Sequence, residues 1–142
     1  MAPQMIFVNL PVKDLDASKA FYEQLGYTIN PQFTDETAAC VVISDTIFAM
    51  LLTEEKFLGF AAPGKVVSDA TKSTEVMCAL SAESREKVDE LADKALAAGG
   101  GAVLPPMDTG FMYGRSFTDL DGHHWEVMWM DPAAVEGGAP QG

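Results

Sequence analysis

Basic residues are scarce in this sequence. Its 142 residues include 9 lysines and arginines against 21 aspartates and glutamates, which gives a formal net charge of −12. Nucleic acids and anionic membrane surfaces attract positively charged proteins, so this imbalance argues against both as partners. We therefore expect an acidic protein that binds neither nucleic acid nor a membrane.

Cysteines and long apolar runs are also few. The two cysteines, Cys40 and Cys78, lie in apolar segments, as reduced core cysteines do, and they do not make a disulfide framework. No apolar run is long enough to cross a bilayer, and residues 1–4 lack the basic start of a secretory signal. We expect a cytoplasmic protein whose 48% hydrophobic content is ample for a packed core.

The first half of the sequence predicts the element order β-α-β-β-β. A helix is expected between the N-cap Asp14 and the terminating Gly26, because apolar residues recur there at helical spacing. Apolar, β-branched runs predict strands around this helix, at residues 5–12, 27–33, 38–43 and 47–52. Residues 53–72 are expected to form a connection with one helical turn near residues 54–58.

The second half repeats this order. Ser84 is a good N-cap, the helix behind it ends at the glycines 99–101, and strands are expected at residues 75–82, 102–104, 115–118 and 124–130. The alternating charges of helix residues 85–94 predict an ordinary solvated face. The pattern indicates an α+β fold of two βαβββ modules, residues 5–58 and 73–130, within one domain spanning residues 1–132. Residues 133–142 are expected to form a flexible tail.

One stretch near the C-terminus, residues 119–130, contains both histidines and both tryptophans. Asp121-Gly122 favours a tight turn, and strand alternation behind it places His124, Glu126, Met128 and Met130 on one face. A carboxylate inside an apolar strand is costly unless it meets a cation, a metal or several donors. Glu126 is therefore the first candidate for a site.

The sequence resembles the vicinal oxygen chelate superfamily, which includes glyoxalase I, bleomycin-resistance proteins and extradiol dioxygenases. The resemblance rests on residues 10–15, 18–22, 25–27 and 119–126, which read LPVKDL, SKAFY, LGY and DLDGHHWE. It implies two βαβββ modules whose mostly antiparallel sheet curls into a cup, often in a homodimer. It also implies that four inward residues, from the first and last strand of each module, can hold one divalent metal.

This metal pattern matches the sequence at one position. Glu126 falls on the C-terminal carboxylate ligand, whereas the other positions fall on Phe7, on Met77 (or Glu75 in a shifted register) and on Ala49 or Met50. Phenylalanine and alanine cannot ligate, and thioethers are poor ligands for metals that prefer carboxylate and imidazole. We expect a degenerate metal site and no cofactor, with zinc, nickel, manganese or iron as the alternative.

Other candidates complete the predicted site. His124 shares the face of Glu126 and is a possible second ligand or base. Phe7, Asn9, Met77, Tyr113 and Arg115 are candidate substrate-binding residues, although Arg115 has an equally good alternative as the partner of an acidic residue.

Three functions stay open at this point. The first is metal-free binding of a small apolar or aromatic molecule, as in the bleomycin-resistance relatives. The second is a metal-dependent lyase, isomerase or dioxygenase of the glyoxalase type. The third is a metal-free isomerase or lyase in which Glu126 and His124 transfer protons.

Overall fold

The computed structural model describes residues 2–136 and divides the chain into two compact units, with the boundary between Ser73 and Thr74. We call the N-terminal part unit 1 and the C-terminal part unit 2, and each is described by itself. The single domain over residues 1–132 stays a prediction.

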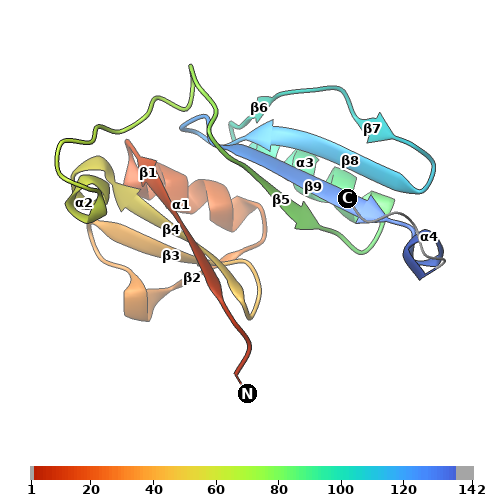
Figure 1. Cartoon of the computed structure of the whole chain (residues 1–142), viewed down its shortest axis with the longest axis horizontal. Helices are drawn as coiled ribbons and strands as arrows, with labels where there is room; N and C mark the ends of the chain where they lie inside the picture. Colours follow the sequence, from red (N-terminus) through yellow and green to blue (C-terminus); the bar gives the residue numbers. More distant parts are fainter. Residues whose placement is uncertain (1, 137–142) are drawn as a thin grey trace. The chain divides into compact units, whose positions relative to one another are not determined.

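Unit 1 contains one four-stranded sheet and two helices. Its elements are β1 (Ile6–Val12), α1 (Leu15–Gln24), β2 (Thr28–Asn30), a 3₁₀ turn (Pro31–Phe33), β3 (Ala38–Val42), β4 (Ile47–Thr53) and α2 (Glu54–Phe60). The strand order is β1-β4-β3-β2, in which β1 and β4 are parallel and the other neighbours are antiparallel (Figure 1). The predicted order β-α-β-β-β is confirmed, although the helical turn near residues 54–58 is a two-turn helix.

Local capping explains where α1 begins and ends. The Asp14 carboxylate accepts a hydrogen bond from the Ala17 N–H at 3.1 Å, which satisfies one of the free donors at the helix start. Gly26 follows the helix with a φ of +105°, a conformation that glycine adopts without strain. Both predicted helix boundaries are confirmed.

The two faces of this sheet differ. On the face that packs against α1, alternate residues are fully buried, among them Leu10, Val12, Ala39, Val41, Ala49 and Leu51. The opposite face, which we call the open face, carries Phe7, Asn9, Phe48, Met50 and Leu52, as the strand register requires. Helix α2 packs on β1 and β4.

Unit 2 has the same topology. Its elements are β5 (Met77–Ser81), α3 (Arg85–Ala97), β6 (Gly101–Ala102), β7 (Met107–Asp108), β8 (Met112–Thr118), β9 (His124–Met130) and α4 (Pro132–Glu136). The order β5-β9-β8-β6 repeats that of unit 1, with β5 and β9 parallel, and β7 pairs additionally with β8. Helix α3 lies behind this sheet in Figure 1 and packs on β8 and β9. The shared topology confirms the internal repeat.

Some boundaries in unit 2 differ from the expectation. Strand β8 begins at Met112 instead of residue 115, β7 had no sequence signal, and β6 spans two residues. Part of the predicted tail, residues 133–136, belongs to α4, and residues 137–142 lie outside the described residues. Gly114 weakened the strand signal of β8, because glycine is unfavourable inside strands.

The core of unit 2 lies between the sheet and α3. Val88 and Ala92 of α3 pack against Val127 of β9, and Trp125 and Phe117 are also buried. Fully burying an apolar side chain of this size contributes roughly 1.5–3 kcal/mol, so these contacts hold the helix on one face. We call the other face of this sheet, which points away from α3 and carries His124 and Glu126, the open face of unit 2.

The α+β fold of two βαβββ modules is confirmed, as two separate sheets of mixed strand direction. Among the described residues, no helix has the length and apolar character needed to span a membrane. Cys40 is buried and Cys78 half-buried, and both are free thiols.

Candidate functional site

The loop that leads into β9 is built around Asp119. This residue is only 4% exposed, and its Oδ1 accepts hydrogen bonds from the Asp121 and His123 N–H groups at 3.0 and 2.9 Å. Gly122 has a φ of +88°, so the predicted turn residue supplies the positive angle. The loop fixes the point at which β9 begins and thus the face on which His124 and Glu126 lie.

His124 and Glu126 form a pair on the open face. His124 Nε2 lies 3.1 Å from Glu126 Oε2, and the two side chains are 10% and 32% exposed. In the register, Met77 and Thr118 flank His124, while Ala79 and Ser116 flank Glu126. The predicted alternation is confirmed, and it brings Met77, His124 and Glu126 together in unit 2.

The side chains around this pair do not fit a chelated metal ion. Within residues 2–136, no three His, Cys, Asp or Glu side chains come close enough together to hold one. Besides His124, the neighbours of Glu126 are an alanine and a serine, and the thioether of Met77 suits softer ions. In unit 1, Phe7 stacks on Phe48 with ring centroids 4.7 Å apart, where the resemblance places a ligand.

A small pocket of about 90 Å³ opens beside Glu126. Leu104, Pro105 and Met107 come from the segment before β8, and Gly114, Ser116 and Met128 come from β8 and β9. A side chain at Gly114 would lie 3.2 Å from Met128 Cγ, so the glycine makes room for this methionine. The pocket offers one carboxylate within a largely apolar lining.

Tyr113 and Arg115 lie with their polar groups on the opposite side of the sheet. Arg115 Nη1 donates to Asp89 and Asp93 of α3 at 3.0 and 2.8 Å, and the Tyr113 hydroxyl donates to Asp89 at 2.6 Å. The alternative that Arg115 pairs with acidic residues is confirmed. Arg115 also lines the pocket, but its guanidinium is held by α3, and substrate binding by these two residues stays a prediction that the geometry does not favour.

The remaining candidates, Phe7 and Asn9, belong to the open face of unit 1. A pocket of about 400 Å³ lies there, lined by Asn9, Leu52, Phe57, Phe60 and Ala61. Asn9 Nδ2 donates to the Phe7 carbonyl at 3.3 Å, a hydrogen bond that does not involve the amide oxygen Oδ1. Phe57 and Phe60 come from α2, so the two-turn helix after β4 supplies the aromatic wall that the sequence did not predict.

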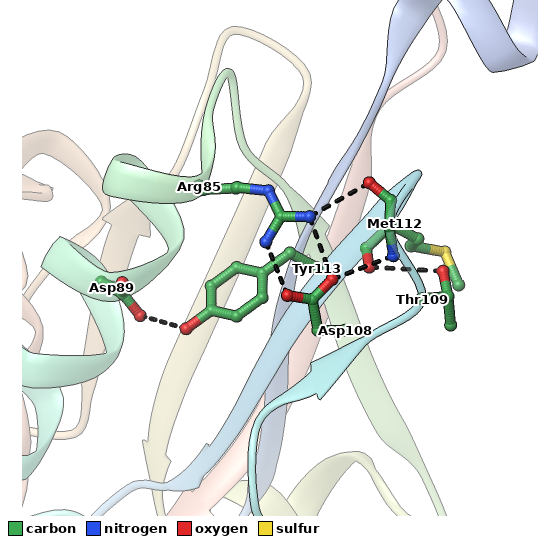
Figure 2. A network of polar contacts seen from close by, with 7 residues as sticks. Arg85, Asp89, Asp108, Thr109, Met112 and Tyr113 are labelled. Atoms are coloured by element: carbon green, nitrogen blue, oxygen red, sulfur yellow. Dashed lines mark hydrogen bonds and ion pairs between the residues drawn. The ribbon is translucent and has the colours of Figure 1, made fainter.

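A network around Arg85 was also missed. Its guanidinium makes two hydrogen bonds to the Asp108 carboxylate at 2.8 and 3.0 Å and a third to the Gly110 carbonyl at 3.1 Å (Figure 2). Hydrogen bonds from Arg85 and from the Gly110 N–H lower the pKa of Asp108 from 3.8 to about 2. The Arg85 side chain is 37% exposed, so this network lies at the protein surface, and Lys87 and Lys94 form exposed pairs with Glu90 on the same helix.

Comparisons with other proteins agree with this fold. A sequence profile of the bleomycin resistance protein-like N-terminal family matches residues 4–44. A hypothetical protein from S. aureus is 34% identical, with a TM-score of 0.73, and the match covers 91% of this chain and 95% of that one. No curated protein matches the chain.

Two more distant structures share the fold. A glyoxalase/bleomycin resistance protein/dioxygenase family enzyme from Burkholderia phytofirmans PsJN is 17% identical over 90% of this chain and 99% of its own, with a TM-score of 0.73. The fosfomycin resistance protein FosX from Listeria monocytogenes is 18% identical over 93% and 97%, with a TM-score of 0.65. The profile, the 34% identical relative and the repeated topology show that this chain belongs to the glyoxalase/bleomycin-resistance family of the vicinal oxygen chelate superfamily.

Proposed function

We propose that this protein binds a small apolar or aromatic molecule without the help of a metal ion. The observation that carries the proposal is the pocket of about 400 Å³ on the open face of unit 1. Pockets for small organic ligands typically measure roughly 300–1,000 Å³ and combine an apolar lining with a few polar groups. Leu52, Phe57 and Phe60 supply the apolar part here, and Asn9 supplies the polar group.

The lining indicates the shape of the ligand. Phe60 is 73% exposed, and a solvent-exposed ring of this kind gains buried area when a planar molecule stacks on it. The Asn9 amide nitrogen donates to the Phe7 carbonyl, and the amide oxygen Oδ1 is a separate acceptor that a donor on the ligand can use. A planar molecule with one N–H or O–H donor satisfies both features.

The charge around Glu126 favours a neutral or positively charged ligand. Within the described part of unit 2, the lysines and arginines all pair with carboxylates other than Glu126: Arg85, Lys87, Lys94 and Arg115. An anion placed on the open face of unit 2 would meet the Glu126 carboxylate, and the arginine that lines the pocket there, Arg115, is already paired with Asp89 and Asp93. Glutathione adducts, which are anionic, are therefore disfavoured as ligands of the open face of unit 2.

A catalytic role for Glu126 and His124 is the second candidate. Their 3.1 Å contact is a hydrogen-bonding distance between an imidazole nitrogen and a carboxylate oxygen, and it supports a metal-free isomerase or lyase. In a metal-dependent lyase or dioxygenase, by contrast, Glu126 would serve as a ligand of zinc, nickel, manganese or iron. Apart from His124, that alternative lacks further ligands of the right type among the neighbours of Glu126 in unit 2.

We also propose an oligomeric state and a cellular location for the protein. Strands β1 and β5 each pair on one side only within the described sheets, and exposed edges of this kind favour pairing between subunits. We therefore keep the homodimer as a proposal, together with the cytoplasm as the site of action.

Indole tests the proposed pocket, because it is planar, apolar and carries one N–H donor. Titration with indole, followed by amide NMR, is expected to shift the Asn9, Phe57 and Ala61 resonances with a dissociation constant of about 1 mM, or roughly −4 kcal/mol. Ala61→Trp fills the pocket from its rim and should abolish these shifts. Ala62→Trp, at the exposed neighbouring residue, is the matched control and should leave them intact. Equal shifts in both variants would place indole elsewhere and contradict the proposal.

A further inference from the structure

One wall of the pocket at Glu126 belongs to a loop whose own apolar contacts are weak. We call residues 103–111, which include β7, the β6–β8 loop. Its large apolar side chains are 39–66% exposed: Val103, Leu104, Met107 and Phe111. Side chains as exposed as these contribute little to fixing a backbone, so polar contacts must hold the loop.

Arg85 supplies the main polar contacts between this loop and α3. As the first residue of α3, it is anchored by a helix that packs on the sheet through Val88 and Ala92. All three of its hydrogen bonds to the loop go to Asp108 and Gly110, and a planar guanidinium paired with a carboxylate in this way is a strong and directional contact. The Arg85 Cζ atom also lies 5.1 and 5.2 Å from the ring centroids of Tyr113 and Trp129.

The strand pairing of β7 connects this contact to the pocket. Asp108 pairs with Tyr113, whose side chain points toward α3, whereas Met107 pairs with Gly114 on the open face. Successive side chains of a strand point to opposite faces, so fixing Asp108 on one face also fixes Met107 on the other. Met107 and Met128 then line the pocket from both sides of Gly114.

We propose that Arg85 is a positioning residue for the pocket at Glu126: it holds the β6–β8 loop from the helix side of the sheet and thereby keeps Met107 in the pocket wall. The Arg85 guanidinium bonds to the loop residues Asp108 and Gly110, the first of which is labelled in Figure 2, and Arg85 is not one of the residues that line the pocket. The inference concerns the shape of the pocket and holds for whichever molecule occupies it. It does not depend on the proposed ligand pocket of unit 1, which is lined by Asn9 and Phe60.

The methionine methyl groups provide the test. The full chain labelled with ¹³C at the methionine methyls reports on Met107 and Met128 at the pocket, and on Met77 and Met50 as internal references. Arg85→Leu and Asp108→Asn should both shift and sharpen the Met107 signal and move that of Met128, while the reference signals stay in place. Arg85→Lys keeps the positive charge but lacks the planar guanidinium that makes two hydrogen bonds to one carboxylate. Its spectrum should therefore lie between those of the wild type and of the Arg85 variant without a charge.

Amide hydrogen exchange completes the experiment. The Thr109 N–H, bonded to the Met112 carbonyl at 2.9 Å, should exchange on the order of tenfold faster in Asp108→Asn, with the amides of α3 unchanged. Lys94→Leu, on the same helix but away from the loop, is the control and should change neither measurement. The proposal is overturned by an unchanged Met107 signal in both variants, or by changes spread equally over all methionines and the α3 amides.

Discussion

Replacing Asp119 with alanine is expected to lower the free energy of unfolding of unit 2 by about 3 kcal/mol. The carboxylate is 4% exposed and accepts two backbone hydrogen bonds within the loop before β9. Hydrogen bonds to a charged acceptor contribute roughly 1.5–3 kcal/mol each, and the removal leaves two N–H groups without this partner. The loop would lose the contacts that set the start of β9.

Urea unfolding followed by tryptophan fluorescence measures this loss. Both tryptophans, Trp125 and Trp129, lie on β9, so the signal reports on unit 2. Asp119→Asn keeps an oxygen acceptor at the same place and should lose less than half as much stability. A change below about 0.5 kcal/mol in Asp119→Ala, the size of an ordinary surface substitution, would show that the loop is held by other contacts.

Replacing Arg115 with methionine is expected to cost about 2 kcal/mol in the same measurement. The Arg115 side chain is 18% exposed and binds Asp89 and Asp93, whose side chains are 47% and 67% exposed. Breaking a fully buried ion pair lowers the free energy of unfolding by roughly 3–5 kcal/mol. Because the two aspartates are partly exposed, we expect a smaller loss here. Lys94→Met removes an exposed pair with Glu90 and should cost less than about 0.5 kcal/mol.

The effect of Arg115→Met should depend on pH in a defined direction. Hydrogen bonds from Tyr113 and then from Arg115 lower the pKa of Asp89 below its ordinary value of 3.8. A lowered pKa contributes stability above the unfolded-state pKa, and that contribution disappears as the pH falls through the folded-state pKa. The stability difference between wild type and Arg115→Met should therefore be largest above pH 4 and shrink in more acidic solution. A stability difference that grows on acidification would contradict the proposal that Arg115 stabilises the fold through its ion pairs with Asp89 and Asp93 of α3.

The sequence predicted most of the fold, because its signals were local. Asp14 and Ser84 are helix caps with hydroxyl or carboxylate groups at the helix start, and their hydrogen bonds to Ala17 and Lys87 are present. The alternation along β9 correctly separated Glu126 from the buried Trp125. Capping and alternation depend on residues close together in the chain, so a single sequence is enough to recognise them.

The candidate site was harder to predict, for two physical reasons. Gly114 obscured the first part of β8, so the predicted strand began at Arg115 and this residue was a candidate for substrate binding. Extending the alternation backward from the buried Phe117 would have placed Arg115 on the helix face. Arg85 and Asp108 are separated by 23 positions, and Asp108 lies in a two-residue strand without its own sequence signal. Such a contact follows from the folded structure and not from any local pattern.

The absence of a chelated metal is the central claim, and a direct titration tests it. Chelator-treated protein and its Glu126→Ala variant are titrated with Zn²⁺, Ni²⁺, Mn²⁺ and Fe²⁺ in a calorimeter under anaerobic conditions. We predict that neither protein binds one equivalent of any of these ions tightly, and that the two titrations coincide. Tight binding of one equivalent by the wild type, lost in Glu126→Ala, would contradict the account and identify Glu126 as a metal ligand.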